Sequence, residues 1–214
     1  MKHTVNLLIQ KVDNEYLEKN YESVVSGLYP ERREKIRQLK YKSSAYVSVT
    51  AGLMLQSVLK QELGLRAEDI CLARGEKGKP YIDGAEHFFF NLSHSGECVV
   101  LAYSDTEVGV DVEQLRDIDI KVAKRCFCTE EYELVRTADN REESFYDIWT
   151  RKESYLKLTG QGISVPLNSF YVLDDMKHLN REKMCFHTER YEDYIISLCT
   201  YDGCDINLLR QQKN

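Results

Sequence analysis

Apolar residues in the first half of the chain follow spacings that predict a strand and then helices. Residues 5–9 alternate weakly and predict a strand, and the polar stretch 14–25 predicts a helix. Pro30 suits the first turn of the next helix, where a missing amide hydrogen leaves no bond unmade. Apolar side chains then recur every three or four positions as far as Leu59, which indicates one or two helices packed on a core. Gly64 is placed to cap the last of them.

Shorter apolar runs separated by turn residues come next, and these predict strands. Residues 71–73 and 81–82 flank a glycine-rich loop at 74–80, which is the layout of a small hairpin. Further strands are expected at 88–92, 98–103 and 108–115, with Ser93, His94, Ser95 and Gly96 as a loop between the first two.

The second half repeats this alternation of helices and strands. Helices are expected at 118–126, at 130–138 with Thr129 as N-cap, and at 144–159 with Gly160 closing the helix. Strands are expected at 170–173, 185–189 and 194–199. Each half has helices and then a strand that ends in a turn of small residues, which is a faint sign of internal doubling. A mixed α/β (α+β) fold is therefore expected, and because no low-complexity linker separates the halves, they should share one interface.

Composition places the chain among soluble globular proteins. Its 214 residues suffice for one compact unit or two fused lobes, and 43% of them are hydrophobic. No apolar run approaches the length of a membrane-spanning helix or a signal-peptide core, so we expect a cytoplasmic monomer that does not bind membranes. The seven cysteines are odd in number and include no Cys-x-x-Cys pair. This argues against a disulfide framework or a zinc ribbon and favours buried, reduced thiols.

Charge is unevenly distributed along the chain. The formal net charge of -6 argues against nucleic acid as a partner, because such binding depends on neutralising phosphates with lysine and arginine. The segment 31–42 is nevertheless basic, with Arg32, Arg33, Lys35, Arg37, Lys40 and Lys42 against Glu31 and Glu34. It is either an ordinary solvated helix face or a docking strip for an anionic small molecule or an acidic partner.

Two acidic residues in a predicted strand are candidates for a metal site. Asp111 and Glu113 are two positions apart, so the alternation of a strand places both carboxylates on the same face. Magnesium prefers a few carboxylates together with water and phosphate oxygens, and the pair could hold such an ion against a diphosphate. By itself this spacing is a weak signal, and an exposed edge strand is the more frequent explanation.

The second candidate lies in the predicted helix at 144–159. Trp149, Glu153 and Lys157 follow one another at four-residue steps and therefore share a helix face. Such a combination is unusual for a core seam, although Trp149 alone would more often be packing and Glu153 with Lys157 could be a surface ion pair. A hydrolase reading of Ser93 and His94 is disfavoured, because adjacent residues rarely form the required hydrogen bond and the chain has no Gly-x-Ser-x-Gly elbow.

The order of these motifs resembles the 4′-phosphopantetheinyl transferase family, specifically its longer, Sfp-type branch. A strand carboxylate pair is followed about forty residues later by Trp-x-x-Lys-Glu-x-x-x-Lys, residues 149–157. The resemblance extends to Asn-x-Ser-His-Ser at 91–95, Gly-Lys-Pro at 78–80 and the basic segment beginning at Pro30. It implies two similar lobes, 1–105 and 106–214, with the active site in the cleft between them.

The resemblance also implies a role for each matching residue. Asp111, Glu113 and Glu153 would hold Mg2+ against the diphosphate of coenzyme A, and Lys157 would neutralise that diphosphate. Other residues match family positions that contact the phosphates and the nucleotide of coenzyme A. They are Ser93, His94, Lys79, Arg32, Lys35 and Ser48. Val47 departs from the pattern, because relatives often carry a basic residue there, and this weakens the expected grip on the 3′-phosphate.

The implied reaction is transfer of 4′-phosphopantetheine to a serine of an acyl or peptidyl carrier protein, with release of 3′,5′-ADP. Positioning and charge stabilisation dominate such chemistry, and Glu153 is the candidate that takes the serine proton. Two alternatives are a metal-dependent phosphohydrolase, which would turn over without a carrier, and a non-catalytic carrier-binding homologue, which would be expected to lack one of the three carboxylates. All three carboxylates are present.

Overall fold

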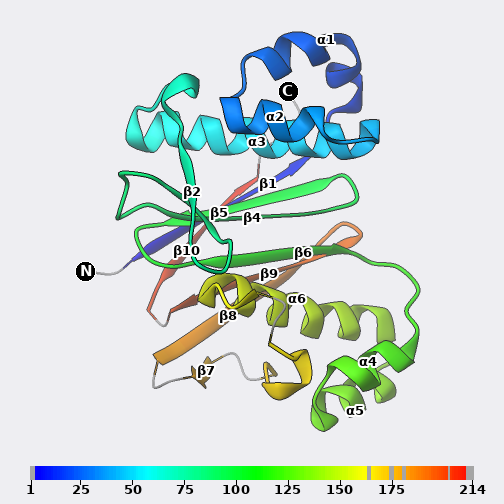
Figure 1. Cartoon of the computed structure of the whole chain (residues 1–214). Helices are drawn as coiled ribbons and strands as arrows, with labels where there is room; N and C mark the ends of the chain where they lie inside the picture. Colours follow the sequence, from blue (N-terminus) through cyan, green and yellow to red (C-terminus); the bar gives the residue numbers. More distant parts are fainter. Residues whose placement is uncertain (1–2, 163–164, 174–175, 180–181, 202, 211–214) are drawn as a thin grey trace.

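Helices cover the outer sides of two sheets that pack against each other (Figure 1). The computed structural model describes residues 3–162, 165–173, 176–179, 182–201 and 203–210. Within these residues, one four-stranded sheet has the order β10-β1-β5-β4, the other has the order β6-β9-β8-β7, and β2 and β3 form a small hairpin.

The first half of the chain contributes β1 (Thr4–Lys11), α1 (Asn14–Ser26), α2 (Pro30–Arg37), α3 (Lys42–Leu63), β2 (Leu72–Arg74), β3 (Pro80–Ile82), β4 (Phe89–Ser95) and β5 (Cys98–Ser104). The second half contributes β6 (Gly109–Gln114), α4 (Ile120–Cys126), α5 (Thr129–Thr137), α6 (Arg141–Thr159), β7 (Met176–Leu179), β8 (Glu182–Tyr191), β9 (Tyr194–Tyr201) and β10 (Asp205–Arg210). The expected mixed α/β class is confirmed.

The two halves share part of their succession of elements. In each half of the described chain, a strand is followed by three helices and then, after β2 and β3 in the first half and after β7 in the second, by an antiparallel hairpin. The second strand of the hairpin pairs antiparallel with the first strand, which gives β1-β5-β4 in one sheet and β6-β9-β8 in the other. The internal doubling suggested by the sequence corresponds to this shared topology.

The last described strand crosses from one half to the other. β10 lies within the range expected for the C-terminal lobe, yet it pairs in parallel with β1, in a register that places Asp205 opposite Thr4. The sheet of the first half is therefore completed by the end of the described chain.

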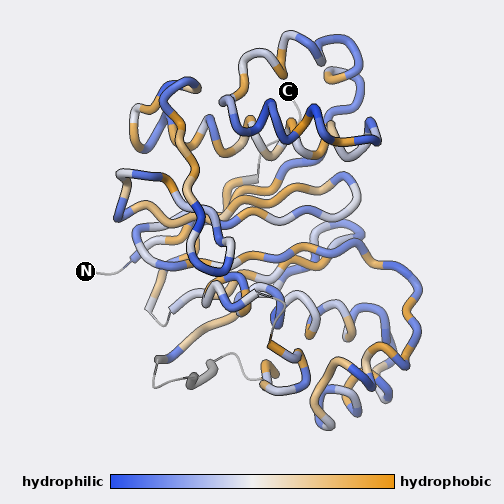
Figure 2. Tube along the Cα trace, in the orientation of Figure 1, coloured by the Kyte–Doolittle hydropathy of each residue, from blue (hydrophilic) through white to orange (hydrophobic). Residues whose placement is uncertain are grey.

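Buried apolar residues lie on both sides of the first sheet, because helices cover one face and the second sheet covers the other. Leu7 and Ile9 of β1 face the second sheet and pack with residues such as Val110 and Ile196, whereas Leu8 packs with the helices. A strand covered on both faces becomes a continuous apolar run, and residues 98–102 of β5 are all completely buried. Figure 2 shows this apolar colouring along the central strands, while α2 is largely hydrophilic.

Three sequence predictions about local structure were wrong. Ser93, His94 and Ser95 belong to β4 and not to a loop, because the hairpin needs only Gly96, with φ +54°, and Glu97 to turn. The N-cap of α5 is Cys128 and not Thr129, since the Glu131 carboxylate reaches back to the Cys128 amide.

The third wrong prediction concerns residues 170–173, which form no strand. Side chains bind their backbone groups instead: Lys152 Nζ donates to the Phe170 carbonyl, and Glu131 Oε1 accepts from the Val172 amide.

Among the described residues, no helix is long and apolar enough to cross a membrane, and no disulfide joins the seven cysteines.

Candidate active site

A polar seam joins β4 of one sheet to β6 of the other. Alternate residues of β4 share a face, so Ser93 and Ser95 both reach toward β6. Ser93 Oγ donates a hydrogen bond to Asp111 Oδ1 at 2.8 Å, and Ser95 Oγ donates to Glu113 Oε2 at 2.8 Å. Two positions before Ser93, the side-chain oxygen of Asn91 accepts a hydrogen bond from the Val110 amide at 3.0 Å. The seam therefore fixes the two strand carboxylates and links the sheets.

Helix α6 supplies a cation to the same seam. Lys157 Nζ lies 2.6 Å from Asp111 Oδ1 and 2.8 Å from Ser93 Oγ. Asp111 is only 4% exposed, and its second oxygen, Oδ2, is buried with no hydrogen-bond partner among the described residues. An unpartnered buried carboxylate oxygen is rare because its desolvation is not compensated, and it marks a place where a cation or donor would be stabilised.

Gly109 allows α6 to lie this close to β6. A Cβ atom at this position would lie 2.0 Å from the Ser154 carbonyl oxygen and 2.4 Å from the Leu158 amide nitrogen, both backbone atoms of α6. Only glycine fits such an approach. The glycine in Gly-x-Asp-x-Glu therefore has a structural role, because it brings Glu153 and Lys157 within reach of the strand carboxylates.

Glu113 and Glu153 share the electrostatic environment of Asp111. The pKa of each side chain is raised above its ordinary value, chiefly by burial and further by the negative charge of Asp111, while Lys157 opposes the shift. The three carboxylates of the sequence prediction are thus electrostatically coupled. As their side chains stand, no group of three His, Cys, Asp or Glu residues in the described chain is arranged to hold a metal ion.

The opposite face of β4 borders a basic pocket of about 510 Å³. His94 lies in its wall together with Arg32 and Lys35 from α2 and Ser48 from α3. Arg32 donates to the Tyr29 hydroxyl at 2.9 Å and to Ser48 Oγ at 3.4 Å. The pKa of His94 is lowered by burial and then by Lys35, Lys157 and Arg32. Ser93 and His94 are thus adjacent in sequence but lie on opposite faces of β4, where they face different groups.

Lys79 lies apart from this basic pocket. Its ammonium pairs with Glu107 and donates to the carbonyls of Val108 at 3.2 Å and Leu158 at 3.0 Å. It lines a second pocket of about 260 Å³ together with Glu153 and Lys157, and Pro80 lines both pockets. Lys79 therefore joins the glycine-rich loop to the C-terminal end of α6, where exposed carbonyls favour a cation.

Sequence reasoning missed three residues of this region. Arg74 lines the basic pocket, and Asn91 and Ser95 belong to the seam. Asn91 and Ser95 could have been found from strand alternation once Ser93 was placed in a strand. Arg74 carried a weaker signal, as the first residue of the glycine-rich loop.

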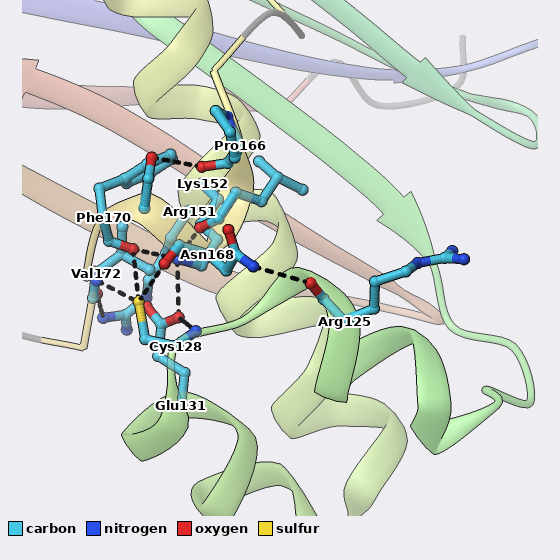
Figure 3. Close-up of polar contacts among 11 residues, drawn as sticks. Arg125, Cys128, Glu131, Arg151, Lys152, Pro166, Asn168, Phe170 and Val172 are labelled. Carbon is cyan, nitrogen blue, oxygen red and sulfur yellow. Dashed lines mark hydrogen bonds and ion pairs between the residues drawn. The ribbon is translucent and has the colours of Figure 1, made fainter.

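Trp149 and Lys152 have structural roles on α6. Trp149 stacks on Phe145 with ring centroids 5.6 Å apart, which is the packing role considered for it. Lys152 is completely buried and forms an ion pair with Glu131 of α5 at 2.8 Å. Figure 3 shows that this pair and neighbouring backbone groups hold the segment around Phe170 against α5 and α6. The pair therefore fixes the part of α6 next to Glu153.

Known families and known proteins match this chain along most of its length. A family model described as "4'-phosphopantetheinyl transferase, N-terminal" matches residues 15–106, and one described as "4'-phosphopantetheinyl transferase superfamily" matches residues 107–199. The chain is 33% identical to 4'-phosphopantetheinyl transferase gsp of Aneurinibacillus migulanus, over 95% of this chain and 89% of that protein. It is 34% identical to 4'-phosphopantetheinyl transferase Sfp of Bacillus subtilis (strain 168), over 75% and 73% of the two chains.

Among solved structures, the holo-[acyl-carrier-protein] synthase of Thermotoga maritima matches 46% of this chain and 64% of its own at 19% identity. Its TM-score of 0.34 is too low to support an inference. The matches in sequence span nearly the whole chain and include the strand, helix and loop motifs of the seam and the basic pocket. This chain therefore belongs to the 4′-phosphopantetheinyl transferase superfamily, in its Sfp-type branch, and is a transferase.

Proposed function

We propose that the protein transfers the 4′-phosphopantetheine group of coenzyme A to a serine hydroxyl of an acyl or peptidyl carrier protein, with Mg2+ and with release of 3′,5′-ADP. The observation that carries the proposal is Asp111, a buried carboxylate with one unpartnered oxygen, placed between a serine-lined strand and a lysine-bearing helix. The active site would lie between the two lobes, 1–105 and 106–214. The protein would act in the cytoplasm.

The chemistry of the donor set fits a magnesium ion. Asp111, Glu113 and Glu153 offer hard oxygen ligands. Burial and the charge of Asp111 raise the pKa of both glutamates, so a nearby cation would stabilise their charged forms. These three residues would hold the ion. When bound, Mg2+ would supply charge neutralisation at the diphosphate oxygens and a fixed geometry for the phosphorus under attack.

The protein's own residues would then divide the remaining tasks. The Lys157 ammonium contacts the Asp111 carboxylate, and Lys157 also lines the second pocket. Its charge can therefore neutralise a diphosphate oxygen. Glu153 lines the same pocket, and its raised pKa suits a group that takes the proton of the attacking serine. The serine oxygen forms a bond to the phosphorus next to pantetheine as the bond from that phosphorus to the 3′,5′-ADP oxygen breaks.

Arg32, Lys35, Ser48 and His94 would bind the nucleotide portion. They line a pocket on the other side of β4 from Asp111, so one strand separates the nucleotide from the diphosphate chemistry. Lys79 has three partners within the protein, and we propose that it orders the loop beside the nucleotide and does not act as a mobile phosphate contact.

The proposal is tested by intact-protein mass spectrometry of apo carrier proteins of several types, incubated with this protein, coenzyme A and Mg2+. We expect a mass gain of one phosphopantetheine on one or more carriers, abolished by a chelator and by replacing the acceptor serine with alanine. Absence of the gain from every carrier type would favour the non-catalytic alternative. Release of nucleotide without any carrier would favour the phosphohydrolase.

A basic face on α4 gives a prediction about carrier docking. Lys121, Lys124 and Arg125 are exposed and lie at three- and four-residue steps, so they share one side of the helix. Carrier domains are acidic as a class, and complementary charge mainly accelerates association. Reversing both lysines, Lys121→Glu with Lys124→Glu, is expected to lower kcat/KM for the carrier by about tenfold or more while coenzyme A affinity stays unchanged.

The matched control places the same two reversals on exposed residues elsewhere, as Lys60→Glu with Arg66→Glu. It equalises the change in net charge and is expected to leave carrier kinetics nearly unchanged. Equal losses in both variants would mean that overall charge, and not the face of α4, guides the carrier.

A further inference from the structure

Ser95 is the last residue of β4, and its hydroxyl has two partners on β6. Ser95 Oγ donates a hydrogen bond to Glu113 Oε2 at 2.8 Å and accepts one from the Gln114 amide at 3.1 Å. A serine hydroxyl has a single hydrogen to donate. Because the Gln114 amide holds the oxygen and Glu113 receives the hydrogen, this contact ties the Glu113 side chain to the backbone of its own strand.

The two serines of the seam have different partners. Ser93 Oγ donates to Asp111 and accepts from the Lys157 ammonium at 2.8 Å, so it contacts a residue that is proposed to meet the diphosphate. Among the described residues, the hydrogen bonds of the Ser95 hydroxyl go to β6 alone. Ser95 therefore acts on the site through Glu113.

The turn after β4 keeps Ser95 against β6. Gly96 has φ +54°, and a Cβ atom there would lie 2.7 Å from Gln114 Oε1 and 3.0 Å from the Tyr194 hydroxyl. The Glu97 amide donates to the same hydroxyl at 3.4 Å. The turn is thus packed closely on the second sheet, and contacts between the two sheets set the position of Ser95.

Holding Glu113 before an ion binds lowers the cost of binding. A free glutamate side chain rotates about several bonds, and ordering it when a ligand binds costs conformational entropy. The Ser95 bond occupies Oε2 and leaves Oε1 for a cation, on the strand face that Glu113 shares with Asp111. Groups that orient a metal ligand in this way raise the affinity of a protein for the metal.

We propose that Ser95 is a positioning residue that sets the affinity of the protein for its divalent cation, by holding the Glu113 carboxylate at the seam between β4 and β6. This inference rests on the proposed function. In this role Ser95 touches neither the cation nor coenzyme A, and loss of its hydroxyl acts through the freedom that Glu113 gains.

The test compares wild type with Ser95→Ala, Ser95→Thr and a matched control, Ser104→Ala. Threonine keeps the hydroxyl and suits a strand. Ser104 is the last residue of β5, and its hydroxyl donates to the Thr4 carbonyl at 2.9 Å, so the control removes a comparable bond away from the seam. Electron paramagnetic resonance measures the Kd of Mn2+ with coenzyme A present, and transfer kinetics give the KM for Mg2+ and kcat separately. Thermal unfolding reports the stability of each variant.

We expect Ser95→Ala to raise the Kd of Mn2+ and the KM for Mg2+ by about 10- to 100-fold, the range for loss of a group that orients a metal ligand. At saturating Mg2+ its kcat should return close to the wild-type value, because the ligands themselves remain. Ser95→Thr should restore most of the affinity, and Ser104→Ala should bind Mn2+ as wild type does.

An unchanged Kd in Ser95→Ala, or an equal loss of affinity in Ser104→Ala, would overturn the role of Ser95 while transfer by wild type still supported the proposed function. A wild-type protein that neither binds Mn2+ nor transfers phosphopantetheine would overturn both.

Discussion

Replacing Asp111 by asparagine is expected to lower kcat/KM for phosphopantetheine transfer by about 10²- to 10³-fold, the loss typical of removing one electrostatic contact to a developing charge. The amide keeps the size of the side chain but removes the charge that Lys157 contacts at 2.6 Å and the buried oxygen proposed as a metal ligand. The change is measured with an apo carrier at saturating Mg2+.

The matched control for this variant is Asp83→Asn, which removes the same charge from an exposed residue after β3. We expect its kinetics to match wild type. A fully active Asp111→Asn enzyme would show that the seam between β4 and β6 is structural and that the chemistry lies elsewhere.

Replacing Glu131 by glutamine is expected to destabilise the fold by about 3–5 kcal/mol, because it leaves the buried Lys152 ammonium without its counter-charge. Glu131 is completely buried and accepts from Lys152, from the Cys128 amide and from the Val172 amide. A glutamine side chain presents an N–H group to one of these donors. Thermal unfolding should show a midpoint lower by about 10 °C.

Glu133→Gln is the matched control for Glu131→Gln, because it makes the same substitution on the same helix. Glu133 is exposed, and its partner Arg136 lies one turn away on the surface. Its loss should leave the unfolding midpoint almost unchanged. Equal midpoints for the two variants would show that the buried pair contributes no net stability.

Most of the elements around the site were predictable from local pattern. Strand β6 and helix α6 lie close to the positions expected for them. Strand and helix geometry alone place Asp111 with Glu113 on one strand face and Glu153 with Lys157 on one helix face. The approach of α6 to β6 was not predictable, because it depends on the missing Cβ of Gly109, whose clash partners are far away in sequence.

Three other features could not be predicted either, because they too depend on residues that are far apart in the sequence. A lysine such as Lys152 is normally a surface residue. Its burial is stabilised by Glu131 and by the carbonyls of Leu167 and Phe170, and the pattern had assigned Phe170 to a strand. β10 was not predicted as a strand, and its pairing with β1 joins residues at opposite ends of the described chain. Arg74 reaches the basic pocket only because the β2–β3 hairpin turns it there, and a glycine-rich loop does not reveal its direction.

The convergence of three carboxylates on one divalent cation is tested most directly by electron paramagnetic resonance of Mn2+, titrated into the protein with coenzyme A present. One ion bound per chain is predicted for wild type and for Asp83→Asn, with strong loss of binding for Asp111→Asn, Glu113→Gln and Glu153→Gln. Binding that is absent from wild type, or that is unchanged by all three substitutions, would contradict the proposed site.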